Sequence, residues 1–139
     1  MATQVYTSGL LALADGSISF GNANVYAVLV TGYTFSAAHS TYSDISANEI
    51  TDADYSPADV AGKSVAASGT NILYDSGDIS FGTDVTIAAE GVIFVVGDEA
   101  APDAGDQLLF HWDFGGSQSS TDSQFQINTP AGIYELQPQ

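Results

Sequence analysis

Cysteine and arginine are both missing from this chain of 139 residues, and lysine occurs only once, at Lys63. Without cysteine the chain has no disulfide and no thiolate zinc site. Seventeen acidic residues give a formal net charge of -16. Nucleic acid binding depends on cations that displace phosphate counterions, and anionic lipid surfaces repel a polyanion. We therefore expect neither a nucleic acid nor a membrane as partner.

Long apolar runs and a basic leader are lacking as well. The run Val92–Val96 is far too short to span a bilayer, and the first residues carry no lysine or arginine, unlike a secretory signal. We expect synthesis in the cytoplasm. The chain is nevertheless 45% hydrophobic and 11% aromatic, which sets it apart from disordered acidic sequences. Its length fits a single domain over residues 1–139.

The N-terminal segment has helical periodicity. Tyr6, Leu10 and Leu13 stand at positions i, i+4 and i+7, the spacing of one helix face. Gly16 can adopt the left-handed conformation that ends many helices. Gly9 lowers the helix propensity by about 1 kcal/mol relative to alanine. We predict a short helix over about 4–14.

The rest of the chain has the periodicity of strands. Residues 25–30 and 92–96 are apolar on both faces, which predicts central buried strands. Residues 108–114 and 124–128 alternate apolar and polar side chains, which predicts strands with one face in the core. Shorter strands are expected at 18–20, 72–74, 79–81, 133–136 and near 60–65. This pattern, punctuated by glycine and Asp/Asn/Ser clusters, predicts an all-β protein: an antiparallel β-sandwich or jelly-roll-like barrel with a short N-terminal helix.

Residues 31–59 form a long polar loop, with one helical turn expected at the capping-box sequence Thr41–Asp44. Aromatic side chains are scattered through this loop, and tyrosine is favoured at interfaces because it combines apolar area with a polar tip. Two interpretations are open: the aromatic residues contact a partner, or they fasten the loop to the sheet. The predicted partner-contact residues are Tyr33, Phe35, His39, Tyr42 and Tyr55.

The sequence favours a protein without catalytic residues, cofactor or metal. It contains two histidines, His39 and His111, and none of the motifs of nucleophilic, zinc or phosphate-binding sites. Carboxylates are the only abundant reactive groups. They crowd two loops, formed by Asp52, Asp54 and Asp59 and by Asp98, Glu99, Asp103 and Asp106. Such loops leave a calcium site open as an alternative, and a small hydrolase that uses Asp98 and Asp103 is the least favoured hypothesis.

The order of several segments resembles a group of small virion structural proteins of tailed bacteriophages. The segments are Tyr6–Gly16 leading into Ile18–Phe20, then 25–30, Gly32–Phe35, His39–Ile45, Asn48–Ile50, Asp113–Gly115, Phe125–Asn128 and Gly132–Ile133. The resemblance runs almost from end to end. It implies a capsid decoration (cement) protein on the outer surface of the virion, with the major capsid protein as partner. It brings no catalytic residues with it.

We therefore expect a capsid decoration protein that stabilises the head by bridging major capsid subunits. Capsid geometry favours symmetric oligomers, and a homotrimer fits local threefold axes. The expected mechanism is the burial of additional surface area between neighbouring shell subunits, with no turnover of a substrate. Two alternatives remain open: a calcium-assisted carbohydrate-binding module, and a tail-associated virion protein.

Overall fold

The computed structural model describes residues 2–129 and 132–136. One α-helix and two short 3₁₀ turns accompany the strands. In chain order the elements are β1 (Ala2–Val5), α1 (Thr7–Ala14), β2 (Val25–Val30), η1 (Tyr42–Asp44), η2 (Ser46–Asn48), β3 (Ala58–Asp59), β4 (Ser64–Ser68), β5 (Asn71–Asp75), β6 (Ile79–Ser80), β7 (Val85–Val96), β8 (Leu108–Ser123), β9 (Gln126–Ile127) and β10 (Tyr134–Leu136).

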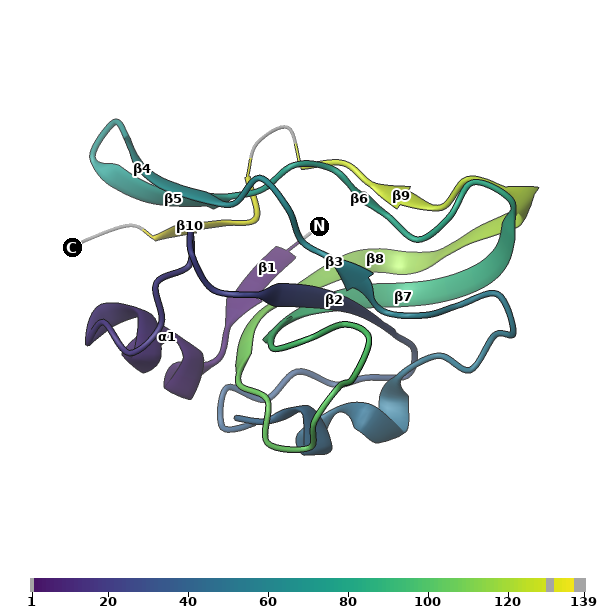
Figure 1. Ribbon diagram of the computed structural model, residues 1–139, viewed down its shortest axis with the longest axis horizontal. Coiled ribbons are helices and arrows are strands. Elements are labelled where there is room, and N and C mark those ends of the chain that lie inside the picture. Colours follow the sequence, from purple (N-terminus) through teal and green to yellow (C-terminus); the bar gives the residue numbers. More distant parts are fainter. Residues whose placement is uncertain (1, 130–131, 137–139) are drawn as a thin grey trace.

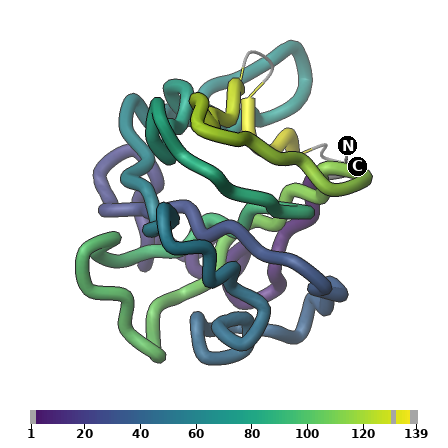
Figure 2. Tube along the Cα trace, turned by 90° about the vertical axis from the view of Figure 1, so that its right-hand side faces the viewer, coloured from purple at the N-terminus to yellow at the C-terminus, as the bar shows by residue number. Residues whose placement is uncertain are grey.

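A central antiparallel sheet with the strand order β1-β8-β7-β2-β3 lies between two other layers. One face is covered by the small sheets β10-β5-β4 and β6-β9, and the other by the loops around residues 31–57 and 97–107 (Figure 1). The view turned by 90° shows the same layering, with the blue loop below and the teal and yellow strands above (Figure 2). The predicted all-β sandwich with a short N-terminal helix is confirmed.

Strand β2 shows how one strand contributes to two cores. All six of its residues are buried. Val25, Ala27 and Leu29 point toward the small sheets and join the larger core with Phe94 and Phe110. The intervening residues point toward the loops and join a second core, whose buried members are Tyr6, Tyr26, Val28, Val30, Ile45, Ile93, Val95 and Leu108. A strand that is apolar on both faces requires cover on both faces, and this layering provides it.

The N-terminal helix begins later than predicted. Gln4 and Val5, expected in a helix over 4–14, lie in β1, which pairs with β8 through Val5↔Phe110 and Gln4↔His111. This segment pairs with the open edge of β8, because pairing gives hydrogen-bond partners to backbone N–H groups that would have none in the first turn of a helix. The predicted left-handed glycine is present, since Gly16 has φ +84° directly after the helix C-cap.

The strand predicted at residues 18–20 is wrong, because these residues form a turn in which the N–H groups of Asn22 and Ala23 donate to the carbonyl of Ser19. Phe20 is nevertheless buried in the larger core. The strand predicted near 60–65 begins only at Ser64, as β4, while β3 lies at the end of the predicted loop over 31–59. β8 continues nine residues beyond the predicted end at 114, to Ser123. Strands were found at the other predicted positions, although β9 covers only Gln126–Ile127 of the segment 124–128. The helical turn expected at Thr41–Asp44 is η1, where an Asp44 carboxylate oxygen accepts the Thr41 N–H at 3.1 Å.

Candidate functional site

Tyr33 and Phe35, at the start of the long loop, pack against the face of the central sheet that the loops cover. The Tyr33 hydroxyl lies 2.9 Å from the Tyr6 hydroxyl and 2.8 Å from Nδ1 of His39. The Phe35 ring is stacked on the His111 imidazole, with 5.8 Å between the ring centroids. Each of these loop side chains is half-buried. Their contacts lie within the protein and hold the loop against β8.

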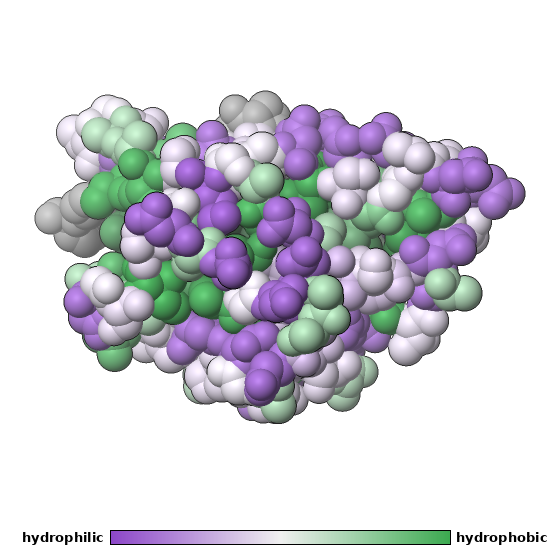
Figure 3. All heavy atoms as spheres, viewed as in Figure 1, coloured by the Kyte–Doolittle hydropathy of each residue, from purple (hydrophilic) through white to green (hydrophobic). Residues whose placement is uncertain are grey.

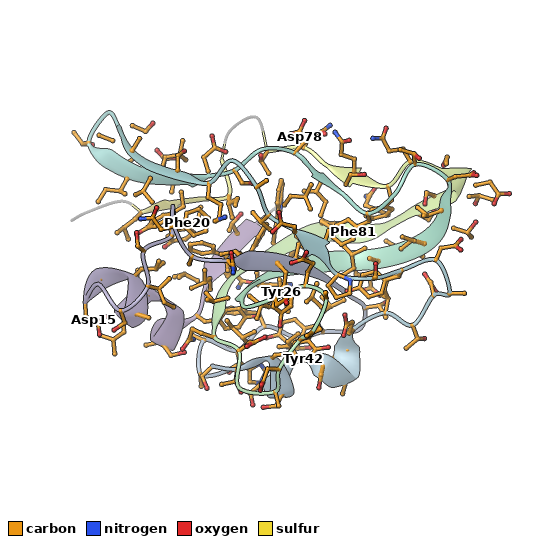
Figure 4. All side chains as sticks on the ribbon, viewed as in Figure 1. Asp15, Phe20, Tyr26, Tyr42, Asp78 and Phe81 are labelled. Carbon is orange, nitrogen blue, oxygen red and sulfur yellow. The ribbon has the colours of Figure 1, made fainter. Side chains whose placement is uncertain are left out.

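Glu49 fastens the middle of the same loop by binding two tyrosines. The Tyr55 hydroxyl donates to one carboxylate oxygen at 2.6 Å and accepts the Leu29 N–H at 3.2 Å, while Tyr42 donates to the other oxygen. Burial raises the pKa of Tyr42 and Tyr55 above the usual tyrosine value. Tyr26, on β2, lies edge-on to Tyr42 beneath the central sheet (Figure 4). The loop is thereby joined to β2 at several points.

These contacts support the second of the two interpretations of the loop aromatics, namely that they fasten the loop to the sheet. A contact of Tyr33, Phe35, His39, Tyr42 or Tyr55 with a partner stays a prediction. Any such contact would use only the part of each side chain that remains exposed.

His111 is a buried histidine on β8. Its Nδ1 lies 3.0 Å from the Gln4 carboxamide oxygen, and its ring is enclosed by Tyr33 and Phe35. Burial lowers the pKa of His111, and the nearby Asp113 carboxylate opposes this to a smaller extent. The neutral imidazole is thus the form that the fold favours.

We expect the protein to lose stability as the pH falls from 7.5 to 5. The pKa of His111 is lower in the folded than in the unfolded chain, so its stabilising effect is present above about pH 6.5 and is lost on protonation. Thermal melting at both pH values measures this loss. His111→Gln should flatten the dependence, while His39→Gln should retain it. If the melting temperature fell by the same amount between pH 7.5 and pH 5 in the wild type and in His111→Gln, the assignment to His111 would be wrong.

The acidic loops serve as hydrogen-bond acceptors for the backbone. The Asp52 and Asp54 carboxylates accept the N–H groups of Ala88 and Thr86, both at 2.9 Å, along the half of β7 that β2 does not reach. An Asp106 carboxylate oxygen accepts the Tyr26 hydroxyl at 2.8 Å. Among the described residues, no three acidic or histidine side chains converge as a metal site requires. The geometry therefore gives the calcium alternative no support.

Strand β4 forms an exposed edge of the small sheet β10-β5-β4. It is joined to β5 by a two-residue turn in which Gly69 has φ +62°, as the first position of a type II′ turn requires. Residues that flank such a turn exchange hydrogen bonds, so Ser64, Ala66 and Ser68 pair with β5. The N–H and C=O groups of Val65 and Ala67 therefore point away from the sheet. In the part of the chain that the structure describes, no other strand pairs with this edge.

Apolar side chains accompany this edge. Among the described residues, the large hydrophobic side chains most exposed to solvent are Leu11 at 63%, Val65 at 46% and Ile72 at 37%. Val65 and Ile72 belong to the β4–β5 hairpin and Leu11 to α1, and hydrophobic residues gather at this end of the molecule (Figure 3). We refer to β4, which includes Val65, together with Ile72, the partner of Ala67 on β5, as the β4 edge. All five β4 residues are exposed, and none of them is charged or proline.

Two of the other edge strands carry features that discourage pairing. β3 has only two residues, follows Pro57 and includes Asp59, while β10 includes Glu135. β1 and β4 lack such features, and β4, with five residues, is the longest edge strand in the described ranges. The sequence does not predict this edge, because the mostly small residues Ser64–Ser68 show no alternation of apolar and polar side chains.

A groove of about 460 Å³ lies between β8 and the segment that contains β9. Aromatic and carboxamide side chains dominate its lining, which consists of Trp112, Phe114, Gln118, Ser119, Gln124, Phe125, Gln126, Ile127 and Asn128. The sequence alone does not predict that these residues lie together. The one available signal was the alternation at 124–128, which placed the carboxamides on the outer face of a strand.

No family model, no curated protein and no solved structure matches the chain. Within the described residues, no helix has the length and apolar character that crossing a membrane requires.

Proposed function

We propose that this protein is a capsid decoration (cement) protein of a tailed bacteriophage, which stabilises the head by bridging major capsid subunits from outside. The observation that carries the protein-binding part of this proposal is the β4 edge, an exposed, uncharged strand that includes the exposed Val65 and pairs with the exposed Ile72 of β5. The virion part is supported by the sequence resemblance. Strand addition at a free edge is a common mode of protein recognition.

In this mechanism an extended segment of the capsid protein adds to β4. The outward N–H and C=O groups of Val65 and Ala67 form the main-chain hydrogen bonds, and the side chains of Val65 and Ile72 bury apolar area on the same hairpin. The net charge of -16 keeps unbound copies apart in solution. A trimer would supply three such edges around a local threefold axis of the shell, so each bound copy would add contacts across a seam between capsomers.

Blocking the β4 edge should abolish binding to heads. Ala67→Pro removes an outward N–H and leaves the hydrogen bonds to β5 intact, because proline is tolerated where the N–H of an edge strand faces solvent. We expect at least a tenfold loss of co-sedimentation with phage heads, and heads treated with the variant should break at the temperature of undecorated heads. Circular dichroism and melting of the free variant verify that it is folded.

Ala67→Thr is the matched control, since threonine keeps the N–H and suits a strand. It should bind heads as the wild type does. Equal binding by the proline and threonine variants would reject edge pairing. Failure of the wild-type protein to sediment with heads or tails would reject a virion role altogether. Sedimentation with tails alone would replace the head by the tail.

A further inference from the structure

A wide bulge in β8 shapes the groove between β8 and β9. Gly91 pairs with Asp113 and Ala89 pairs with Gln118, so four residues of β8, 114–117, oppose the single residue Glu90 of β7. Gly115 has φ +79° and Gly116 has φ +158°, conformations that glycine adopts readily. Bulges bend a strand and redirect its side chains. Trp112 precedes this bulge, Phe114 is its first residue, and Gln118 and Ser119 follow it. All four side chains line the groove.

Two partly exposed aromatic rings form the apolar side of the groove. Trp112 and Phe114 are two residues apart on β8 and project from the same face of the central sheet. Both are half-buried and pack against the larger core, which holds them in position. Phe125 and Ile127, which are buried, complete this wall from the β9 side.

Carboxamides form the polar side. Gln124, Gln126 and Asn128 alternate with the buried residues Phe125 and Ile127, so their side chains lie along one exposed face. Gln124 donates to the carboxamide oxygen of Gln126, whose own nitrogen donates to the Asn128 oxygen at 2.7 Å. This chain of hydrogen bonds orients the three groups and leaves an acceptor on Gln124 and a donor on Asn128 for a ligand.

We propose that this groove binds a neutral saccharide. A sugar ring has an apolar face of C–H groups that packs on aromatic rings, and hydroxyl groups at its rim that match the donor and acceptor of a carboxamide. The volume of about 460 Å³ lies within the range of small-ligand sites. No residue that lines the groove in the described chain is charged, and the net charge of -16 repels anionic sugars.

This inference does not depend on the decoration proposal. β9 and the β4–β5 hairpin occupy different parts of the long axis of the molecule (Figure 1). A protein attached through the β4 edge could therefore still present the groove to a glycan. Tests of the groove use the isolated protein, so that their failure leaves the binding to heads untouched.

Trp112 is the only tryptophan of the chain, so its fluorescence reports on the groove directly. The test is a titration with hexasaccharides of α-1,4-glucose, β-1,4-glucose, mannose and N-acetylglucosamine, with hexagalacturonate as the anionic comparison. We expect a saturable change in emission with at least one neutral hexasaccharide, half-complete at about 1 mM or below, and none with hexagalacturonate. The absence of a saturable change with every neutral sugar overturns the proposal.

Gln126→Ala tests the polar side without removing the fluorophore or a core side chain. Loss of one carboxamide should raise the half-saturating concentration about fivefold. Asn22→Ala, an exposed carboxamide outside the lining, should leave it unchanged. Equal titration curves for wild type and Gln126→Ala overturn the proposed site. A panel of unglycosylated extended peptides is titrated in parallel, and a response to peptides alone overturns the saccharide assignment in favour of a protein ligand.

Discussion

Replacing Gly9 with alanine is expected to lower the free energy of unfolding by about 3 kcal/mol. Gly9 is the buried residue of α1, and a Cβ at this position would lie 2.3 Å from the carbonyl oxygen of Leu108 and 3.0 Å from Cα of Leu109. Both atoms belong to the backbone of β8 and cannot rotate away. The helix would have to move off the sheet, and the melting temperature should fall by about 10 °C. Urea and thermal unfolding measure the effect.

Gly21→Ala is the matched control. The nearest atom to a Cβ there is the Lys63 carbonyl oxygen at 3.9 Å, an ordinary van der Waals contact. Its stability should differ from the wild type by no more than about 0.5 kcal/mol. If Gly9→Ala were as stable as Gly21→Ala, the close approach of α1 to β8 would be wrong.

Glu49→Ala is expected to cost about 3 kcal/mol, because the substitution leaves the hydroxyls of Tyr42 and Tyr55 without their acceptor. Both tyrosines are half-buried, so water replaces the lost hydrogen bonds only in part. The long loop should also open. Limited proteolysis should therefore cut residues 31–57 in the variant faster than in the wild type, in parallel with a lower melting temperature.

Glu90→Ala serves as the control for removing a carboxylate. Glu90 is exposed and accepts one hydrogen bond, from Thr31 at 2.7 Å, so its loss should change stability by about 0.5 kcal/mol or less. Tyr55→Phe should cost about 1 kcal/mol less in Glu49→Ala than in the wild type, because both changes remove the hydrogen bond from Tyr55 to Glu49, whereas the bond from the Leu29 N–H is lost in either background. Additive costs would show that Glu49 and Tyr55 do not interact.

Much of the fold could be predicted because the central strands are locally unambiguous. Val25–Val30 is apolar on both faces, and residues 124–128 alternate strictly, so each segment has one structure that buries its apolar side chains. The N-terminus was harder. Gln4 and Val5 fit a helix by spacing, and only the free edge of β8, more than 100 residues away in sequence, makes them a strand. Pairing between distant segments leaves no local signal in either of them.

The two candidate binding surfaces were missed for a similar reason. β4 is an open edge because, in the described part of the chain, β5 is the one strand that pairs with it. This depends on how the sheet is assembled and not on the residues Ser64–Ser68. The groove is lined by Trp112 on β8 and by the carboxamides of residues 124–128, and the bulge that includes Gly115 shapes its β8 side. The loop aromatics were recognised from the sequence, yet their partners, Glu49 and His111, became apparent only in three dimensions.

The carboxylates of Asp52 and Asp54 have a consequence for assembly. By occupying the N–H groups of Ala88 and Thr86, they close half of β7 to any incoming chain. Together with the short, acidic β3, this leaves the β3 side of the central sheet unsuited to propagating a chain of copies. A strand from another copy would therefore have to add to the central sheet from its β1 side.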